Sequence, residues 1–265
     1  MFVKPFRLEP TFHEKVWGVH DLRPWFPVSD RKIGEVWLSM PDPFPILVKF
    51  LFTSGRLSVQ VHPDDAYAQA HEGCSGKAEM FYVLDAEPGA KLAAGFLRPL
   101  SRVEAREAAL SGEIEHLLRW FPVAAGQVCC IPPGMVHALG AGITVCEVEQ
   151  NSPVTYRLYD YGRPRQLHLD KALDVARLEP VPGPFEPVGP LLASCQFFVA
   201  ERLVVTETVY QPDPSRFHLL VVMEGSGRIG EERFAPGEAW YIPAGSDPFL
   251  MAADPRAVLL RTFVP

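Results

Sequence analysis

One stretch decides the fold of this chain: GQVCCIPPGMVH, residues 126–137. Apolar strand formers, Val128 to Ile131, run into a Pro-Pro-Gly turn, and His137 follows at a fixed offset as the chain re-enters a sheet. The spacing Gly-x5-Pro-x-Gly-x2-His therefore predicts a strand, a tight turn and a second strand that begins with a histidine.

A second stretch, LSVQVHPDD at residues 57–65, supplies partners for that histidine. Alternation along a strand sends Gln60 and His62 to one face and the two valines to the other. Pro63 then ends the strand, because it has no N–H to donate. An amide oxygen and an imidazole thus project inward as neighbours, which indicates a metal site inside a small β-barrel.

Bulk composition indicates one or two domains with cores of ordinary size, since 48% of the 265 residues are hydrophobic. A formal net charge of −7 argues against a nucleic-acid or anionic-membrane surface, so local cations must meet any anionic substrate. The five cysteines show no Cys-x-x-Cys spacing, and the start of the chain lacks the apolar core of a signal peptide. We expect a cytoplasmic protein, with the choice between monomer and homodimer left open.

An internal repeat indicates the domain organisation. GEAWYIPAG, residues 237–245, has the same Gly-x5-Pro-x-Gly frame, but Pro248 stands where the first copy has His137, and proline cannot bind a metal. Short apolar runs punctuated by proline and glycine are typical of an all-β protein. We therefore expect an all-β fold of two jelly-roll barrels in tandem. The Gly-x5-Pro-x-Gly-x2-His frame resembles the second motif of the cupin family, which implies barrels of the cupin type.

The expected boundaries follow from the proline-rich segment between the two copies. They are a metal-binding domain over residues 1–180, a stiff linker over 181–190, and a second barrel without metal ligands over 191–265. A short helical segment is expected at about 100–120, where Ser101 begins a capping box.

A third stretch, GKAEMFYVL at residues 76–84, completes the metal site. Glu79 opens a strand, and Lys77 lies two residues earlier on the same face. Gln60 and His62 alone would more often be a half-buried polar pair, but adding Glu79 and His137 favours a metal site. Two imidazoles, a carboxylate and an amide oxygen suit a borderline divalent ion, and they do not separate zinc from iron or manganese.

Four motifs in this order closely resemble the type I mannose-6-phosphate isomerases, which are zinc enzymes of the cupin class. The motifs are QVHPDD (60–65), GKxEMxYVL (76–84), PPGxVHALGAG (132–142) and QNSPVTYRLYDYGR (150–163). The resemblance is dense from about residue 49 to 173. The segment between Glu79 and His137 is short, so the chain looks like the compact bacterial form.

The resemblance implies one zinc ion per chain. It places the ligands at Gln60, His62, Glu79 and His137, the catalytic arginine at Arg157, and a lysine that lines the active site at Lys77. The expected activity is the interconversion of mannose 6-phosphate and fructose 6-phosphate.

The residues themselves are compatible with that chemistry. Removing a proton beside a carbonyl and returning it to the next carbon through an enediol builds charge on the carbonyl oxygen, which a metal ion stabilises as a Lewis acid. Arg157 is suited to hold the oxyanion or a phosphate with two hydrogen bonds. Lys49 and Lys77 add positive charge for the phosphate. We expect Lys49 and Glu147 to bind substrate, and the proton carrier stays open among Lys77, Glu147 and zinc-bound water.

Several alternatives remain at this point. Lys49, inside an apolar run, either points into a polar cavity or snorkels outward. Arg163 either pairs with Asp160 or contacts substrate. A cupin oxygenase with iron in the same pocket would have an apolar cavity, and a sugar-phosphate-binding cupin would keep the pocket without turnover.

Overall fold

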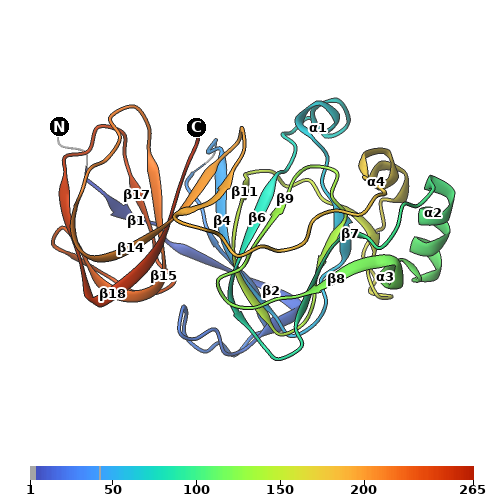
Figure 1. Cartoon of the computed structure of the whole chain (residues 1–265), viewed down its shortest axis with the longest axis horizontal. Helices are drawn as coiled ribbons and strands as arrows, with labels where there is room; N and C mark the ends of the chain where they lie inside the picture. Colours follow the sequence, from blue (N-terminus) through green and yellow to red (C-terminus); the bar gives the residue numbers. More distant parts are fainter. Residues whose placement is uncertain (1–3, 42) are drawn as a thin grey trace. The chain divides into compact units, whose positions relative to one another are not determined.

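Short apolar runs broken by proline and glycine form antiparallel strands, and the helices are few and short (Figure 1). The computed structural model describes residues 4–41 and 43–265. They fall into two compact units: unit 1 holds residues 4–15, 19–41, 43–50 and 187–265, and unit 2 holds residues 16–18 and 51–186. The chain is mostly β, as the sequence predicts.

Unit 2 contains two antiparallel sheets with an apolar core between them. The strands are β5 (Val59–Val61), β6 (Glu79–Ala86), β7 (Lys91–Phe96), β8 (Leu118–Pro122), β9 (Val128–Ile131), β10 (His137–Leu139), β11 (Ile143–Gln150) and β12 (Tyr156–Tyr159). One sheet has the order β12-β5-β10-β7-β8, and the other contains β11, β6 and β9 in that order. Phe81, Leu92 and Ile131 are buried in the cluster that joins the two sheets.

The helices also belong to unit 2: α1 (Asp65–Glu72), α2 (Arg102–Ser111), α3 (Ile114–Leu117) and α4 (Leu169–Val175). Half of the predicted capping box forms: the Ser101 hydroxyl accepts a hydrogen bond from the Glu104 N–H at 3.1 Å, while the Glu104 carboxylate pairs with Arg98. The helical segment does not run unbroken to residue 120. Gly112 ends α2 with a left-handed φ of 86°, and the chain from Leu118 pairs as β8 with β7. Within the described residues, no helix has the length and apolar character needed to cross a bilayer.

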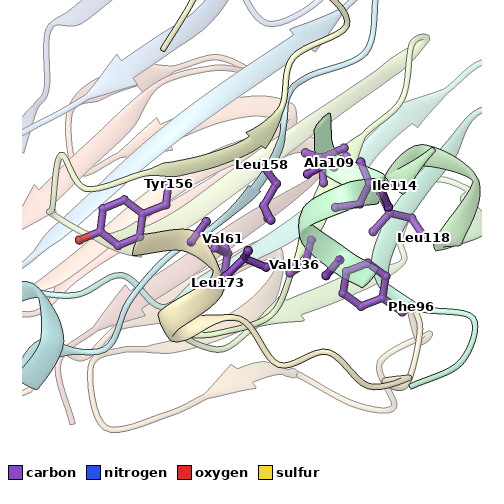
Figure 2. Close-up of a cluster of buried hydrophobic side chains, with 14 of the residues drawn as sticks. Val61, Phe96, Ala109, Ile114, Leu118, Val136, Tyr156, Leu158 and Leu173 are labelled. Carbon is purple, nitrogen blue, oxygen red and sulfur yellow. The ribbon is translucent and has the colours of Figure 1, made fainter. Parts of the chain in front are cut away.

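The helices cover the outer face of the five-stranded sheet (Figure 2). Val61 on β5, Val136 before β10 and Leu158 on β12 pack with Ile114 and Leu173 in one buried cluster. Since neighbours along a strand point to opposite faces, Gln60 and Arg157 project to the other side, between the two sheets. The alternation predicted around Gln60 is therefore confirmed.

Most residues of the remaining strands lie in unit 1. They are β1 (Phe6–Arg7), β2 (Pro10–Val19), β3 (Ile33–Leu38), β4 (Ile46–Thr53), β13 (Leu191–Ser194), β14 (Val199–Tyr210), β15 (His218–Ile229), β16 (Glu232–Phe234), β17 (Ala239–Ile242) and β18 (Phe249–Phe263). One sheet has the order β1-β17-β15-β18-β14-β13, with β16 beside β15. Leu220, Trp240 and Met251 are buried in its core.

The bounds of the compact units differ from the expected domain boundaries at the N-terminus. The sequence predicts a first domain over residues 1–180, whereas β1 pairs with β17, with Phe6 opposite Tyr241. The expected linker is also partly tied down, because Phe185 exchanges two backbone hydrogen bonds with Val128 in unit 2. Cross-strand pairing, which composition does not reveal, accounts for both differences.

The two copies of the Gly-x5-Pro-x-Gly frame have matching backbone geometry, each within its own unit. Gly126 and Gly237 have left-handed φ values of 90° and 88°, and Gly134 and Gly245 have 84° and 71°. The equivalent hydrogen bonds are Gly126 N to Val83 O (2.8 Å) and Gly237 N to Val222 O (2.9 Å), and Met135 N to Pro132 O (3.1 Å) and Ser246 N to Pro243 O (3.3 Å). The repeat read from the sequence is thus a repeat of local structure.

Candidate metal centre

Three predicted site residues lie in one row across the five-stranded sheet. His137 at the start of β10 is directly opposite Gln60 on β5, and Gln60 is directly opposite Arg157 on β12. Directly opposed residues of antiparallel strands share a face. The sheet therefore carries an imidazole, an amide and a guanidinium side by side on its inner face.

The second sheet supplies the carboxylates. Glu79 at the start of β6 is opposite Glu149 on β11, and Phe81 is opposite Glu147. Glu79, Glu147 and Glu149 are all buried, and their carboxylate oxygens lie within 4.8 Å of one another. Three acidic groups packed this closely in the interior need cations nearby.

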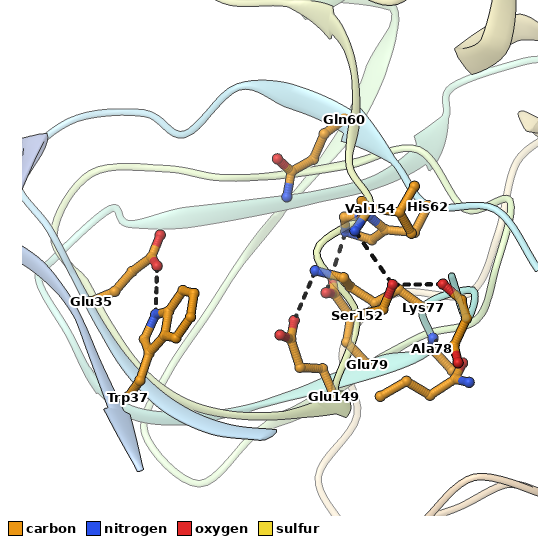
Figure 3. A network of polar contacts seen from close by, with 12 residues as sticks. Glu35, Trp37, Gln60, His62, Lys77, Ala78, Glu79, Glu149, Ser152 and Val154 are labelled. Atoms are coloured by element: carbon orange, nitrogen blue, oxygen red, sulfur yellow. Dashed lines mark hydrogen bonds and ion pairs between the residues drawn. The ribbon is translucent and has the colours of Figure 1, made fainter. Parts of the chain in front are cut away.

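His62, Glu79 and His137 form a compact group whose ligand atoms lie within 4.8 Å of one another. The Glu79 carboxylate is 3.3 Å from His62 Nε2 and 2.9 Å from His137 Nε2. All three side chains are at most 2% exposed. Figure 3 shows His62 and Glu79 converging next to Gln60.

Backbone contacts determine which nitrogen each imidazole presents. His62 Nδ1 lies 3.0 Å from the Val154 carbonyl oxygen, and His137 Nδ1 lies 3.0 Å from the Met135 carbonyl oxygen. A carbonyl only accepts, so each Nδ1 carries the proton and each Nε2 directs a lone pair toward Glu79. Lone pairs facing a carboxylate repel unless a cation lies between them.

Orphaned polar atoms support the same interpretation. His62 Nε2 and Glu79 Oε1 are buried and have no hydrogen-bond partner within the described part of the chain. A cation shared by the group would satisfy both atoms. A second layer holds His62 in place, since the Val154 N–H donates to Ser152 Oγ and Ser152 Oγ donates to the Ser75 carbonyl. The donor set therefore fits a divalent metal ion.

Burial sets the protonation states that metal binding needs. Burial lowers the pKa of His62, more strongly than the nearby Glu79 raises it. Burial alone would raise the pKa of Glu79, but positive charge at the positions of His62 and His137 brings that pKa well below its usual value. A neutral imidazole next to an ionised carboxylate is the combination that binds a divalent ion without first losing a proton.

Gln60 lies at the rim of this group. Its amide Nε2 is 3.2 Å from His137 Nε2, and its Oε1 accepts a hydrogen bond from Ser58 at 3.1 Å. A rotation of the amide by 180° would direct the oxygen to the metal group instead. Direct metal binding by Gln60 stays a prediction.

Lys77 and Glu149 form a buried ion pair beside the metal group. Lys77 Nζ is 3.3 Å from Glu149 Oε2, with 6% and 1% of the two side chains exposed. The sequence predicts Lys77 beside Glu79, but Glu149 is not among the predicted site residues. The available signal was the alternation of Glu147, Val148 and Glu149, which puts a second carboxylate on the same face of the strand.

Arg157 has a guanidinium that is not fully engaged. Its Nε is buried and has no hydrogen-bond partner among the residues that the structure describes. Burial lowers the pKa of Arg157, as does the nearby Arg165, while Asp160 raises it. Asp160 is itself occupied by Arg163 and Arg165, each at 2.6 Å. Of the two interpretations of Arg163, the structure contains the ion pair.

Lys49 belongs to unit 1, where it is 7% exposed. Its Nζ lies 5.1 Å above the Trp37 ring, and the Trp37 indole N–H donates to Glu35 at 2.8 Å. Lys49 is thus buried in a polar environment and does not snorkel outward, which decides between the two alternatives.

Comparisons with known proteins agree with these observations. No protein-family model matches the chain. The mannose-6-phosphate isomerase of Streptococcus mutans is 32% identical, over 88% of this chain and 89% of that protein. A mannose-6-phosphate isomerase of Bacillus subtilis is 30% identical, over 94% of this chain and 96% of that protein.

A solved structure adds the fold. The crystal structure of the mannose 6-phosphate isomerase from Bacillus subtilis matches with a TM-score of 0.86 and 28% sequence identity, covering 97% of this chain and 99% of that one. The likeness extends over both units, including the part that follows the proline-rich segment. The chain belongs to the mannose-6-phosphate isomerase family.

Proposed function

We propose that this protein interconverts mannose 6-phosphate and fructose 6-phosphate. The observation that carries the proposal is the convergence of His62, Glu79 and His137 on one buried point, with His137 in the same row of the five-stranded sheet as Gln60 and Arg157. Membership of the family supports the choice of substrate and reaction.

The proposed metal is one zinc ion per chain, held by His62, Glu79, His137 and Gln60. The supporting argument is the donor set of two imidazoles, one carboxylate and one amide, which suits a borderline divalent ion. When bound, such an ion supplies Lewis-acid polarisation of the sugar carbonyl.

The residues of the chain supply binding and proton transfer. We propose Arg157 as the group that holds the developing oxyanion or the phosphate, because its buried Nε is available and a guanidinium offers a planar fork. Lys77 and Glu147 are the proposed carriers of the proton that moves between neighbouring carbons. Lys77 lies 3.3 Å from Glu149, and we propose that Glu147 and Lys49 bind the substrate.

We further propose that each unit is built on a cupin-type barrel, and that the protein works in the cytoplasm as a monomer or homodimer. The matching backbone hydrogen bonds of the two Gly-x5-Pro-x-Gly frames support a tandem repeat. The cysteine pattern supports a reducing compartment.

A coupled assay with mannose 6-phosphate tests the activity, using protein as purified, after chelation, and after reloading with zinc or iron. We expect turnover to fall with metal content and to return with zinc in the absence of oxygen. Turnover that needs iron and oxygen would favour an oxygenase. Sugar-phosphate binding by the zinc-loaded protein without turnover would favour a binding protein.

A further inference from the structure

His168 lies where a helix and an edge strand meet. It is the residue immediately before α4, and its carbonyl accepts the first helical hydrogen bond, from the Ala172 N–H at 2.8 Å. The side chain at this position normally caps the helix, and serine, threonine, aspartate and asparagine are preferred there. The His168 side chain makes no such cap. Because the His168 ring does not cap the helix, a different use of the ring must explain why a histidine stands at this position.

That use is a two-way contact with the backbone of Arg157. The Arg157 N–H donates to His168 Nδ1 at 3.2 Å, and the His168 N–H donates to the Arg157 carbonyl at 2.8 Å. β12 is the last strand of its sheet, and among the described residues β5 is its one strand partner. On the open side, the imidazole nitrogen and the His168 amide replace the carbonyl and N–H of a missing strand.

Arg157 needs such support more than an interior residue does. β12 has four residues, and edge strands lose their pairing more readily than central ones. A shift of this backbone would move the guanidinium out of its row with Gln60 and His137. Misplacement of a catalytic group by about 1 Å can cost about a hundredfold in rate.

We propose that His168 is a positioning residue, whose Nδ1 and amide N–H clamp the Arg157 backbone so that its guanidinium faces the metal group. This inference rests on the proposed role of Arg157. The clamp requires a neutral His168, because a proton on Nδ1 would point a donor at the donor N–H of Arg157. Protonation therefore opens the clamp.

The groups that face His168 favour the neutral ring. Burial lowers the pKa of His168, and the positive charges of Arg157 and Lys171 lower it further, against a smaller opposing effect of Glu72. Tyr156, with its ring centroid 6.1 Å away, adds an aromatic wall. The clamp is thus closed at neutral pH and opens as the pH falls below the ordinary histidine range of about 6.5.

Two variants distinguish the contribution of the His168 ring from that of its Nδ1 acceptor. His168→Phe keeps a ring against Tyr156 but removes the acceptor, whereas His168→Asn places an amide oxygen near the position of Nδ1 and does not titrate. In zinc-loaded protein we expect His168→Phe to lower kcat/KM for mannose 6-phosphate about five- to tenfold, the size of one lost hydrogen bond, at unchanged zinc content. For His168→Asn, kcat/KM should stay within about twofold of that of the natural protein. The pH profile of kcat/KM for this variant should lack the part of the decline at acid pH that opening of the clamp causes.

Hydrogen exchange at the Arg157 amide is the second readout, and it needs no substrate. His168→Phe should speed this exchange about five- to tenfold, and His168→Asn should not. If the protein does not turn over mannose 6-phosphate, the proposed function is wrong. Hydrogen exchange at the Arg157 amide still shows in that case whether the clamp exists. Unchanged exchange in His168→Phe overturns the clamp. Faster exchange with unchanged kcat/KM, or an equal loss of zinc in both variants, overturns the positioning role.

Discussion

The two copies of the Gly-x5-Pro-x-Gly frame share a backbone and differ in chemistry. In unit 2, Glu79 begins the strand that pairs with the frame, and His137 stands at the end of the frame. Both residues belong to the metal group. In unit 1 the same frame follows the strand that His218 opens and ends at Pro248. Glu79 is opposite Ile131 and His218 is opposite Ile242, so the two strands pair with their frames in the same register.

His218 shows how a buried histidine differs from a metal ligand. Its Nδ1 lies 2.6 Å from the Tyr210 hydroxyl, not a backbone carbonyl, and no carboxylate is within ion-pair distance in the described structure. Burial and the nearby Arg261 lower the pKa of His218 to about 4. The frame is therefore a folding device, and the side chains at its ends determine whether it also carries a metal group.

The largest effect is expected from replacing His137, the residue at the end of the unit 2 frame. His137→Ala should lower metal affinity by more than the roughly 10- to 100-fold typical of losing a supporting residue, and should abolish measurable turnover. Metal content by elemental analysis and the coupled assay measure this. Pro248→Ala, at the matching position of the other copy, is the control and should change neither. Full metal content in His137→Ala would contradict the metal centre.

Arg157→Ala should come next. We expect kcat to fall about 100- to 1,000-fold, as on removal of an oxyanion donor, while zinc content stays within error of the natural protein. Arg157→Lys should recover only part of this loss, because lysine lacks the planar fork. Parallel losses of zinc and activity would instead give Arg157 a structural role.

The buried histidine of unit 1 predicts a pH dependence of stability. The folded pKa of about 4 lies below the unfolded value of about 6.5, so the neutral ring stabilises the fold above pH 6.5. That stability is lost as the pH falls from about 6.5 to about 4, by on the order of 3 kcal/mol. His218→Asn, which keeps an acceptor for Tyr210 and does not titrate, should flatten this part of the curve. Denaturant unfolding at several pH values measures the free energy of unfolding of the natural protein and of the variant. An identical pH dependence in both would refute this role of His218.

The smallest effects concern the glycines of the frame. Any alanine at these positive φ values costs about 1–2 kcal/mol. A Cβ at Gly134 would also lie 2.8 Å from the Val175 carbonyl oxygen, whereas one at Gly245 would meet nothing within 4 Å. Gly134→Ala should therefore lower the free energy of unfolding more than Gly245→Ala, by about 1 kcal/mol, as read from denaturant midpoints.

The other glycine pair should show the reverse order. A Cβ at Gly237 would lie 2.3 Å from the Trp25 carbonyl oxygen, whereas Gly126 has open space. Gly237→Ala should then be the more destabilising of the two. Equal losses in both pairs would mean that only the backbone conformation matters and that the surroundings of each copy do not.

Sequence reasoning worked best where a single short segment contains the whole cause. The face on which Gln60 lies follows from strand alternation, and the helix start at Ser101 follows from the capping hydroxyl of this serine. The pairing of Asp160 with Arg163 spans three residues and was among the alternatives. In each case the interacting groups are near neighbours in the chain.

Contacts between distant segments were the ones that sequence reasoning missed. Glu149 meets Lys77 only because β11 pairs with β6 in a particular register. His168 reaches the Arg157 backbone only because α4 packs against the open side of β12. No local pattern predicts either meeting.

The sequence by itself determined the strand periodicity, the repeated turn frame and the residue types able to bind a metal, because periods and turn chemistry are local properties of the backbone. Only the tertiary structure decided which of those residues meet. Strand register and sheet order depend on long-range pairing and on burial of apolar faces, and these bring His62, Glu79 and His137 to one point while the second frame, with Pro248, is left without a comparable group among the described residues.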